Sequence, residues 1–295
     1  MMQLNELASR YLPESAKTQI RKARMLQLGP RQLTSSWRVL PDFLVLGVQK
    51  SGTTSLFQYL MQHRQIASSF KKEVHFFDWN YTKGASWYRA FFPTRGKVNR
   101  RARSFGQYLC GEATPYYIFH PGVPKRVHGL LPAAKFIVVL RNPVDRAYSH
   151  YQHSVTRNQE TCSFEEAIAR EPERLRGEEE KLNRDEAYVS IPHIQHSYFS
   201  RGCYADQFQR WFEYFPSESF FIASTEELSA NPQIVCDEIT DFLELSSQTV
   251  RASRRHNANR YSPMSESFRE VLAGRYRDHN QRLYEMLGRD FGWDR

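Results

Sequence analysis

Residues 42–60 read DFLVLGVQKSGTTSLFQYL, and the rest of the fold can be built outward from them. The unbroken apolar run at 43–46 is typical of a strand buried in a parallel sheet, and the pattern of 53–60 predicts a helix. Between them, Gly47 and Gly52 have the spacing of a loop whose backbone N–H groups close around a phosphate. The stretch therefore predicts a phosphate-binding turn at the carboxyl end of a strand.

The position of the lysine separates this loop from that of ATPases. There, a lysine directly follows the second glycine; here Thr53 stands in that place, and Lys50 comes two positions before Gly52. A second apolar run, 135–140 (KFIVVL), ends in Arg141, where nucleotide-hydrolysing proteins have a magnesium-binding aspartate. A cation there can bind an anion directly, which argues against a P-loop nucleotide kinase.

The composition indicates a folded protein with an acidic partner. Of the 295 residues, 40% are hydrophobic and 14% aromatic, which excludes a disordered chain. The formal net charge of +9 predicts an anionic partner, such as a nucleotide, a glycan, a lipid or nucleic acid, without choosing among them. No apolar run approaches the roughly 18 residues of a membrane span, and residues 1–40 have no signal-peptide core, so we expect a soluble protein without a transmembrane segment.

The residues that commonly bind metals are not grouped in the sequence. His150 and His153 lie close together but have no acidic or thiol companion, so we expect no metal. The cysteines have neither metal-ligand nor disulfide-framework spacing, and we expect buried free thiols at Cys110, Cys162, Cys203 and Cys236.

Strands that alternate with helices predict the architecture. The expected class is α/β, a P-loop-like doubly wound parallel sheet of about five strands flanked by helices. We expect a basic arm or helix at 1–40 and a single domain at 41–295. The predicted strands are 43–46, 66–68, 108–112, 135–140 and 220–223.

Several other segments have recognisable local patterns. Asn142-Pro143 predicts the start of a helix, and Ser163 with Glu166 forms a capping-box pattern. Residues 94–106 are expected to form a basic loop. A second basic loop is expected at 251–260, followed by two helices.

Residues 71–78, KKEVHFFD, place the carboxylate of Glu73 two positions before the imidazole of His75. A solvated charged turn is one interpretation of this segment. Ligands of doubly wound sheets bind beyond the carboxyl ends of the strands. Because Lys50, Glu73 and Arg141 are all expected at that edge, we favour a catalytic interpretation.

Five segments, in this order along the chain, together resemble a known family: LGVQKSGTTSL, KKEVHFFD, GEATPYY, VVLRNPVDRAYSHY and NQRLYEMLGRDFGW. The chain from about residue 42 onward resembles the sulfotransferases that use 3′-phosphoadenosine 5′-phosphosulfate (PAPS), most of all the carbohydrate branch related to heparan sulfate sulfotransferases. The resemblance implies transfer of a sulfuryl group from PAPS, with 3′-phosphoadenosine 5′-phosphate (PAP) as product.

On the donor side, the resemblance implies that Lys50 contacts the 5′-phosphosulfate and stabilises charge on the leaving oxygen. The 3′-phosphate would be held by Arg141 and Ser149. The 5′-phosphate would lie against the loop residues Ser51, Gly52, Thr53 and Thr54.

On the acceptor side, the resemblance implies that Glu73 is the general base on the acceptor hydroxyl. His75 and Asp78 would orient this base or the acceptor. The expected acceptor is a saccharide; an amine, a small molecule or a lipid is also compatible with these motifs, and nucleic acid is not expected.

The chain also departs from the family pattern. The heparan sulfate enzymes usually have a disulfide-closed hairpin and a Lys-Gly-Arg loop over the cofactor, whereas residues 254–260 have neither cysteine nor Lys-Gly-Arg. Arg260, with Arg254 or Arg255, is the candidate for that role. The Golgi enzymes also have an N-terminal anchor that this sequence lacks, so we expect a cytoplasmic enzyme.

Two other functions stay open from the sequence. A P-loop nucleotide kinase would need a lysine after Gly52 and an aspartate in place of Arg141. A non-enzymatic module could bind a polyanion through the basic segments 94–106 and 251–260, but it would leave Glu73 without a role.

Overall fold

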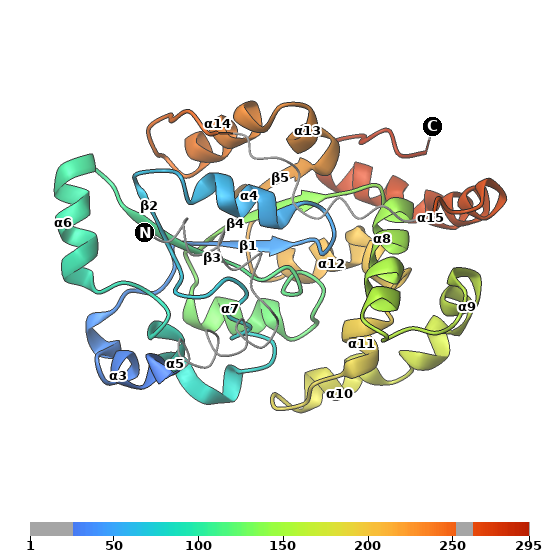
Figure 1. Ribbon diagram of the computed structural model, residues 1–295, viewed down its shortest axis with the longest axis horizontal. Helices are drawn as coiled ribbons and strands as arrows, with labels where there is room; N and C mark the ends of the chain where they lie inside the picture. Colours follow the sequence, from blue (N-terminus) through green and yellow to red (C-terminus); the bar gives the residue numbers. More distant parts are fainter. Residues whose placement is uncertain (1–25, 252–261, 295) are drawn as a thin grey trace.

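The computed structural model describes residues 26–251 and 262–294. Five parallel strands form one sheet in the order β2-β3-β1-β4-β5 (Figure 1). This arrangement confirms the expected five-stranded parallel α/β fold. The strands are β1 (Phe43–Gly47), β2 (Ile66–Ser68), β3 (Leu109–Ala113), β4 (Lys135–Leu140) and β5 (Phe220–Ser224).

Helices cover both faces of the sheet (Figure 1). The alternation of side chains along β1 supplies both cores. Phe43 and Val45 pack in the cluster that includes α4 (Thr53–Leu60) and α14 (Pro232–Phe242). Leu44 and Leu46 belong to the cluster on the opposite face. The helices on that opposite face are α5 (Gly84–Arg89), α7 (Val123–Leu130) and α12 (Tyr204–Phe212).

A group of helices lies at the right of Figure 1, beyond the carboxyl ends of the strands. Apolar residues of α8, α9 and α15 form a third cluster there. The helices are α8 (Pro143–Thr156), α9 (Phe164–Arg174), α10 (Glu178–Arg184), α11 (Ile191–Gln195) and α15 (Glu266–Leu287). The remaining helices and short 3-10 turns of the described residues are α3 (Leu28–Leu33), α6 (Arg95–Phe105), α13 (Thr225–Ala230), Ser35–Trp37, Tyr81–Lys83, Ser200–Gly202 and Ser217–Ser219.

Two predicted helix starts are confirmed in detail. The Asn142 side chain accepts the N–H of Val144 at 3.0 Å at the start of α8. At the start of α9, the Ser163 hydroxyl accepts the N–H of Glu166 at 3.2 Å, and the Glu166 carboxylate accepts the N–H of Ser163 at 3.0 Å. Both caps satisfy N–H groups that have no partner inside the helix.

The prediction of a loop at 94–106 is wrong, because this segment contains the helix α6 (Arg95–Phe105). The Thr94 hydroxyl accepts the N–H of Lys97 at the start of α6, and Gly106 ends it with a φ of 83°. Arginine, lysine and alanine all have high helix propensity. The sequence interpretation considered the charge of this segment and not that propensity.

Two further predictions needed correction. A single 22-residue helix, α15, spans a region where two helices were expected, and Gly274 lies inside it. The aromatic segment 84–92, whose composition also predicts a helix, is helical only as far as Arg89, where α5 ends. All four cysteines are free, as predicted, but only three are buried: Cys162 is partly exposed, so the expected burial is wrong for that residue. In the described part of the chain, no helix is long and apolar enough to cross a membrane.

Candidate functional site

Three segments far apart in sequence meet beyond the carboxyl ends of the strands. The Arg141 guanidinium donates a hydrogen bond to the carbonyl oxygen of Lys50 at 2.9 Å. The N–H of Glu73 donates to the carbonyl of Ala113, the last residue of β3, at 3.0 Å. The structure therefore brings together the loop after β1, the segment around Glu73 and the end of β4.

Lys72 links the phosphate loop to the segment of the expected base. Its ammonium group donates to the hydroxyl of Thr54 at 2.7 Å and lies 3.2 Å from a carboxylate oxygen of Glu73. The sequence interpretation assigned this lysine no role. Its position next to Glu73 was a signal for a site role.

Backbone strain is concentrated at the predicted catalytic residues. Lys50, Glu73 and His75 have φ values of 75°, 58° and 56°, in the left-handed region that side chains other than glycine rarely adopt. Among the described residues other than glycine, only Asn158 and Glu244 share a positive φ. Such conformations persist where the surrounding structure enforces them, and they cluster at functional sites. This observation supports a functional site independently of sequence resemblance.

The phosphate loop is fixed by contacts of its own. The buried hydroxyl of Ser51 donates to the carbonyl of Val48 at 2.6 Å. The Thr225 hydroxyl lies 2.9 Å from the Ser51 carbonyl oxygen and 2.8 Å from that of Leu140, so it ties the loop to the end of β4. Gly52, with a φ of 88°, is the N-cap of α4. The N–H groups of the first turn of α4, which has no acidic residue, are suited to an anion.

Cations surround this loop. The pKa of Lys50 is lowered to about 8, mainly by burial and then by the positive charges of Arg141, Arg157 and Arg146. An anion among these cations would offset their mutual repulsion. The loop is therefore electrostatically suited to a phosphate or a sulfate ester.

The buried Arg201 supports the loop after β1 through its hydrogen bond to Gln49. No pattern in the sequence indicated this role. Arg201 is 1% exposed and donates to the side-chain oxygen of Gln49 and, at 2.6 Å, to the carbonyl of His193. Burial lowers the pKa of Arg201 to about 9. Its guanidinium also lies over the rings of Tyr116 and Phe119, at 5.1 and 4.8 Å.

The segment around Glu73 forms a chain of charged groups. His75 lies with Nδ1 2.7 Å from the buried Asp78 carboxylate and with Nε2 3.9 Å from that of Glu73. Burial lowers the pKa of His75, but both carboxylates outweigh it and raise the pKa to about 9. Burial raises the pKa of Glu73, yet His75 and Lys72 bring it down to about 2. Both groups are therefore charged at neutral pH.

Packing holds this segment in place. The rings of His75 and Trp79 are stacked, with centroids 3.8 Å apart and an interplanar angle of 4°. The Tyr117 hydroxyl accepts the N–H of Phe76 at 2.7 Å, and Arg126 donates to the carbonyl of Phe77 at 2.8 Å. Tyr117 belongs to the GEATPYY segment, so its motif was recognised, but its contact across the fold was not predictable.

One predicted donor-binding residue is not joined to the site by these contacts, and another lies outside the described residues. Ser149 is buried on α8 at 6% exposure, and no hydrogen bond of the described residues connects it to the phosphate loop. Arg260, with Arg254 and Arg255, lies outside the described residues. The roles of both stay predictions.

Comparison with known proteins identifies the family. The family model named "Sulfotransferase domain" matches residues 40–272. The chain belongs to the sulfotransferase family. A crystal structure of a sulfotransferase from Alicyclobacillus acidocaldarius is 31% identical to this sulfotransferase, with a TM-score of 0.65, and the match covers 87% of this chain and all of the other.

Curated relatives place this sulfotransferase near enzymes named for heparan sulfate. Heparan sulfate glucosamine 3-O-sulfotransferase 6 of Mus musculus is 29% identical, over 87% of this chain and 75% of the relative. The membrane-associated sulfotransferase kil1 of Dictyostelium discoideum is 28% identical, over 86% of this chain and 66% of the relative. The human bifunctional heparan sulfate N-deacetylase/N-sulfotransferase 3 is 31% identical over 84% of this chain, but the match spans only 30% of that relative.

A pocket of about 290 Å³ adjoins the phosphate loop of this sulfotransferase. Its lining includes Gln49, which precedes Lys50, and Trp79, which stacks on His75. His150 also lines it; this side chain is 1% exposed, and its Nδ1 has no hydrogen-bond partner among the described residues. The buried imidazole beside the pocket therefore keeps one nitrogen without a hydrogen bond to a described residue.

The histidines of the pocket are neutral at physiological pH. Burial, with the charges of Arg201 and Arg146, holds the pKa of His150 well below its ordinary value. Burial, with the charges of Lys50 and Arg157, lowers the pKa of His153 to about 4. Neutral imidazoles can both donate and accept hydrogen bonds, so this wall of the pocket can bind hydroxyl groups.

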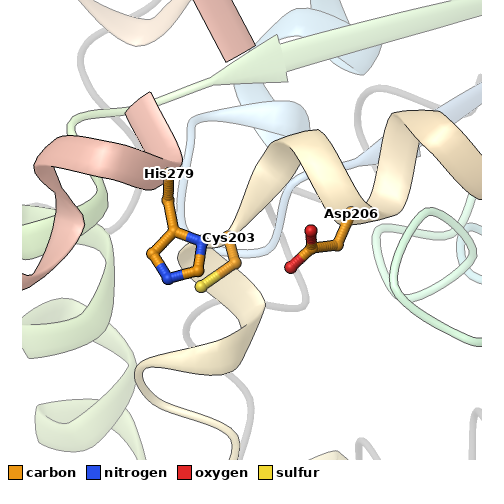
Figure 2. Close-up of side chains that lie close together, drawn as sticks. All are labelled: Cys203, Asp206 and His279. Atoms are coloured by element: carbon orange, nitrogen blue, oxygen red, sulfur yellow. The ribbon is translucent and has the colours of Figure 1, made fainter. Parts of the chain in front are cut away.

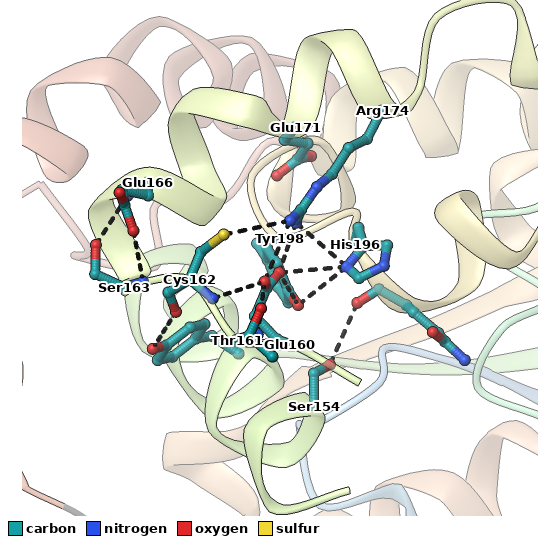
Figure 3. A network of polar contacts seen from close by, with 12 residues as sticks. Ser154, Glu160, Thr161, Cys162, Ser163, Glu166, Glu171, Arg174, His196 and Tyr198 are labelled. Carbon is teal, nitrogen blue, oxygen red and sulfur yellow. Dashed lines mark hydrogen bonds and ion pairs between the residues drawn. The ribbon is translucent and has the colours of Figure 1, made fainter. Parts of the chain in front are cut away.

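A network around Glu160 fixes the outer wall of the pocket (Figure 3). Glu160 is paired with Arg174 at 2.5 Å and accepts the hydroxyl of Tyr198 at 3.1 Å. The network joins the loop after α8 to α9 and to the segment after α11, while Ser154 donates to the carbonyl of Gln195 at 3.3 Å. Its polar groups therefore hold the elements that line the pocket.

One group of side chains in the described part of the chain has the composition of a metal site. Cys203, Asp206 and His279 place one donor atom each within 4.8 Å of one another (Figure 2). Asp206 already pairs with Arg282 at 3.0 Å, so a cation balances its charge. The sequence interpretation missed this grouping because α12 and α15 are distant in sequence, and we assign it no role in catalysis.

Proposed function

We propose that this sulfotransferase transfers the sulfuryl group of PAPS to a hydroxyl group of a saccharide, with Glu73 as general base and Lys50 stabilising the leaving group. The observation that carries the proposal is the link through Lys72 between Thr54 and Glu73. It ties a carboxylate to an anion-binding loop, as an in-line transfer between donor and acceptor requires.

The proposed binding of PAPS is argued from the positive charges and the backbone N–H groups of the loop after β1. The loop N–H groups, Thr53 and Thr54 would hold the 5′-phosphate, with Lys50 at the bridging oxygen. Arg141, already beside the Lys50 carbonyl, would hold the 3′-phosphate together with Ser149 and Arg260. That no metal ion is required stays a prediction.

The chemistry is a single displacement. The acceptor oxygen forms a bond to sulfur while the bond from sulfur to the bridging oxygen breaks, and its electron pair stays on the phosphate. Lys50, as the cation, stabilises that developing charge. Glu73 takes the proton of the acceptor hydroxyl. Because its pKa is about 2, Glu73 is a weak base, and we infer that proton transfer follows the start of bond formation to sulfur.

The acceptor would bind in the pocket beside Trp79. Neutral His150 and His153 suit hydroxyl groups, and the Trp79 ring offers a face to a sugar. A saccharide acceptor is supported by the name of a relative, heparan sulfate glucosamine 3-O-sulfotransferase 6. An amine, a small molecule or a lipid fits the same chemistry and belongs in the acceptor screen. The expected cytoplasmic location stays a prediction for cell fractionation.

The test combines donor binding with transfer. Calorimetry with PAP should give tight binding, and ATP at the same concentration should compete weakly, because it lacks the 3′-phosphate. Sulfate-labelled PAPS should then label one class in a panel of saccharides, amines, phenols and lipids. Tight PAP binding without transfer to any acceptor would favour a binding module, and preferential ATP binding with phosphate transfer would favour the kinase alternative.

A further inference from the structure

The segment from Leu26 to Trp37 carries an unusual concentration of exposed apolar side chains. Leu26, Leu33 and Trp37 are 79%, 87% and 67% exposed. No other large apolar side chain among the described residues exceeds the 57% of Val271. Scattered single exposures are ordinary in soluble proteins, whereas a local group of them indicates an interaction surface.

A strongly basic helix adjoins this segment. Helix α6 has no buried residue, and its five basic residues, Arg95, Lys97, Arg100, Arg101 and Arg103, are all exposed. None of them forms an ion pair with a described residue. Arg64 adds a cation, since it and Arg101 both lie 5.7 Å from the ring of Phe105.

Backbone contacts hold the two features together. Arg38, next to Trp37, forms an isolated antiparallel bridge with Thr94, the residue before α6. The N–H of Val39 donates to the carbonyl of Pro93 at 3.1 Å. In Figure 1 both α3 and α6 lie at the left, whereas β1 points to the right, toward the phosphate loop. The apolar and basic groups thus lie at the end of the molecule opposite the transfer site.

We propose that α3, Trp37 and α6 form a surface that docks on an anionic lipid bilayer. Stable adsorption of a protein to a bilayer takes two signals, an apolar group that enters the interface and basic groups that meet the anionic headgroups. Leu26, Leu33 and Trp37 supply the first signal and α6 supplies the second. A sulfated or carboxylated polymer would use the basic groups but leave the apolar ones unexplained, so the bilayer is the better match.

The orientation has a consequence for the enzyme. A bilayer at the α3 and α6 end leaves the phosphate loop and the adjoining pocket facing solution. Turnover of a soluble acceptor should therefore continue on the membrane. Membrane binding and the proposed sulfuryl transfer can therefore be tested separately, because loss of membrane binding need not affect turnover.

The test is co-sedimentation of the full chain with vesicles. We expect binding to phosphatidylcholine vesicles that contain phosphatidylserine, weaker binding as salt increases, and little binding to phosphatidylcholine alone. The combined change Arg100→Gln, Arg101→Gln and Arg103→Gln should weaken binding on the order of tenfold or more. The pair Leu33→Ser and Trp37→Ser should weaken it as well, with turnover of a soluble acceptor unchanged.

Matched controls separate the surface from bulk charge. Arg170→Gln, Arg176→Gln and Arg184→Gln remove the same charge from exposed positions in the α9 to α10 region, and Ile234→Ser with Val271→Ser removes exposed apolar groups elsewhere. Both controls should bind as the parent protein does. The proposal is overturned if the parent ignores anionic vesicles, if the control arginines matter equally, or if the chain binds heparin-type polymers and the apolar pair has no effect on vesicles.

Discussion

The two basic regions of this sulfotransferase both contain lysine and arginine side chains, but they differ in how far these side chains are exposed to water. At the carboxyl ends of the strands, Arg201 is buried and Lys50 is half-buried, and burial lowers the pKa of each. At the other end, the cations of α6 are exposed and have no ion-pair partner among the described residues. Desolvation makes a single buried charge strong, whereas exposed charges are screened and act together. Single substitutions should therefore be severe at the first region and mild at the second.

The largest effect is expected for Glu73→Gln. Loss of the general base should lower kcat by about 10²- to 10⁴-fold while the protein stays folded. The matched control is Glu244→Gln, because Glu244 also has a left-handed φ, of 59°, but lies in an exposed ion pair with Lys135. Steady-state kinetics and a thermal melt measure both variants. Near-normal turnover of Glu73→Gln would remove Glu73 from the mechanism.

Next in size is Lys50→Ala. Removing the cation at the leaving oxygen should lower kcat by about 10²- to 10³-fold and weaken PAP binding. Lys97→Ala on α6 removes the same charge from the exposed region and should leave both quantities unchanged. Similar losses in the two variants would mean that net charge, and not desolvated position, governs donor binding.

A smaller loss is expected for Lys72→Met, which breaks the link between Thr54 and Glu73. Because the ammonium charge lowers the pKa of Glu73, its removal should raise that pKa. The acid limb of the kcat/KM profile should move to higher pH, with turnover reduced less than by loss of Lys50. A purely structural role for Lys72 would lower activity without moving the limb.

The pH dependence of PAP binding tests the state of Lys50. Its pKa in the free enzyme is lowered to about 8, so Lys50 is charged below that pH and loses its charge above it. PAP affinity should therefore fall as pH rises beyond about 8, and this fall should be reduced in Lys50→Ala. Calorimetry across this range measures it; an unchanged slope in the variant would assign the effect to another group.

The smallest effect on catalysis is expected from the α6 substitutions. Replacing Arg100, Arg101 and Arg103 by glutamine should leave kcat and KM for a soluble acceptor within experimental error. Kinetics at moderate salt are the measurement. A large rise in KM would extend the acceptor site to α6 and contradict the separation of the two regions.

Most of the fold followed from local patterns. The five strands, the helix after Asn142 and the capping box at Ser163 were predicted because apolar runs and caps act over a few residues. The prediction of a loop at 94–106 was wrong because the charge of this segment favoured an exposed loop, whereas its helix propensity favoured the helix α6 that forms there. The candidate site was predicted in part: Arg141 contacts the Lys50 backbone, and Glu73 is linked to the same loop through Lys72. The roles of these residues stay predictions, while Lys72, Arg201 and Thr225 were missed as supports.

The sequence by itself determined the loop between β1 and α4, the parallel sheet and the family, because the spacing of glycines and the apolar runs are local properties. Only the tertiary structure decided which groups become a site. The left-handed backbone at Lys50, Glu73 and His75, the lowered pKa of Lys50 and the free nitrogen of buried His150 all depend on neighbours distant in sequence. Strain and desolvation arise only when the folded chain encloses a residue, so no local pattern could supply them.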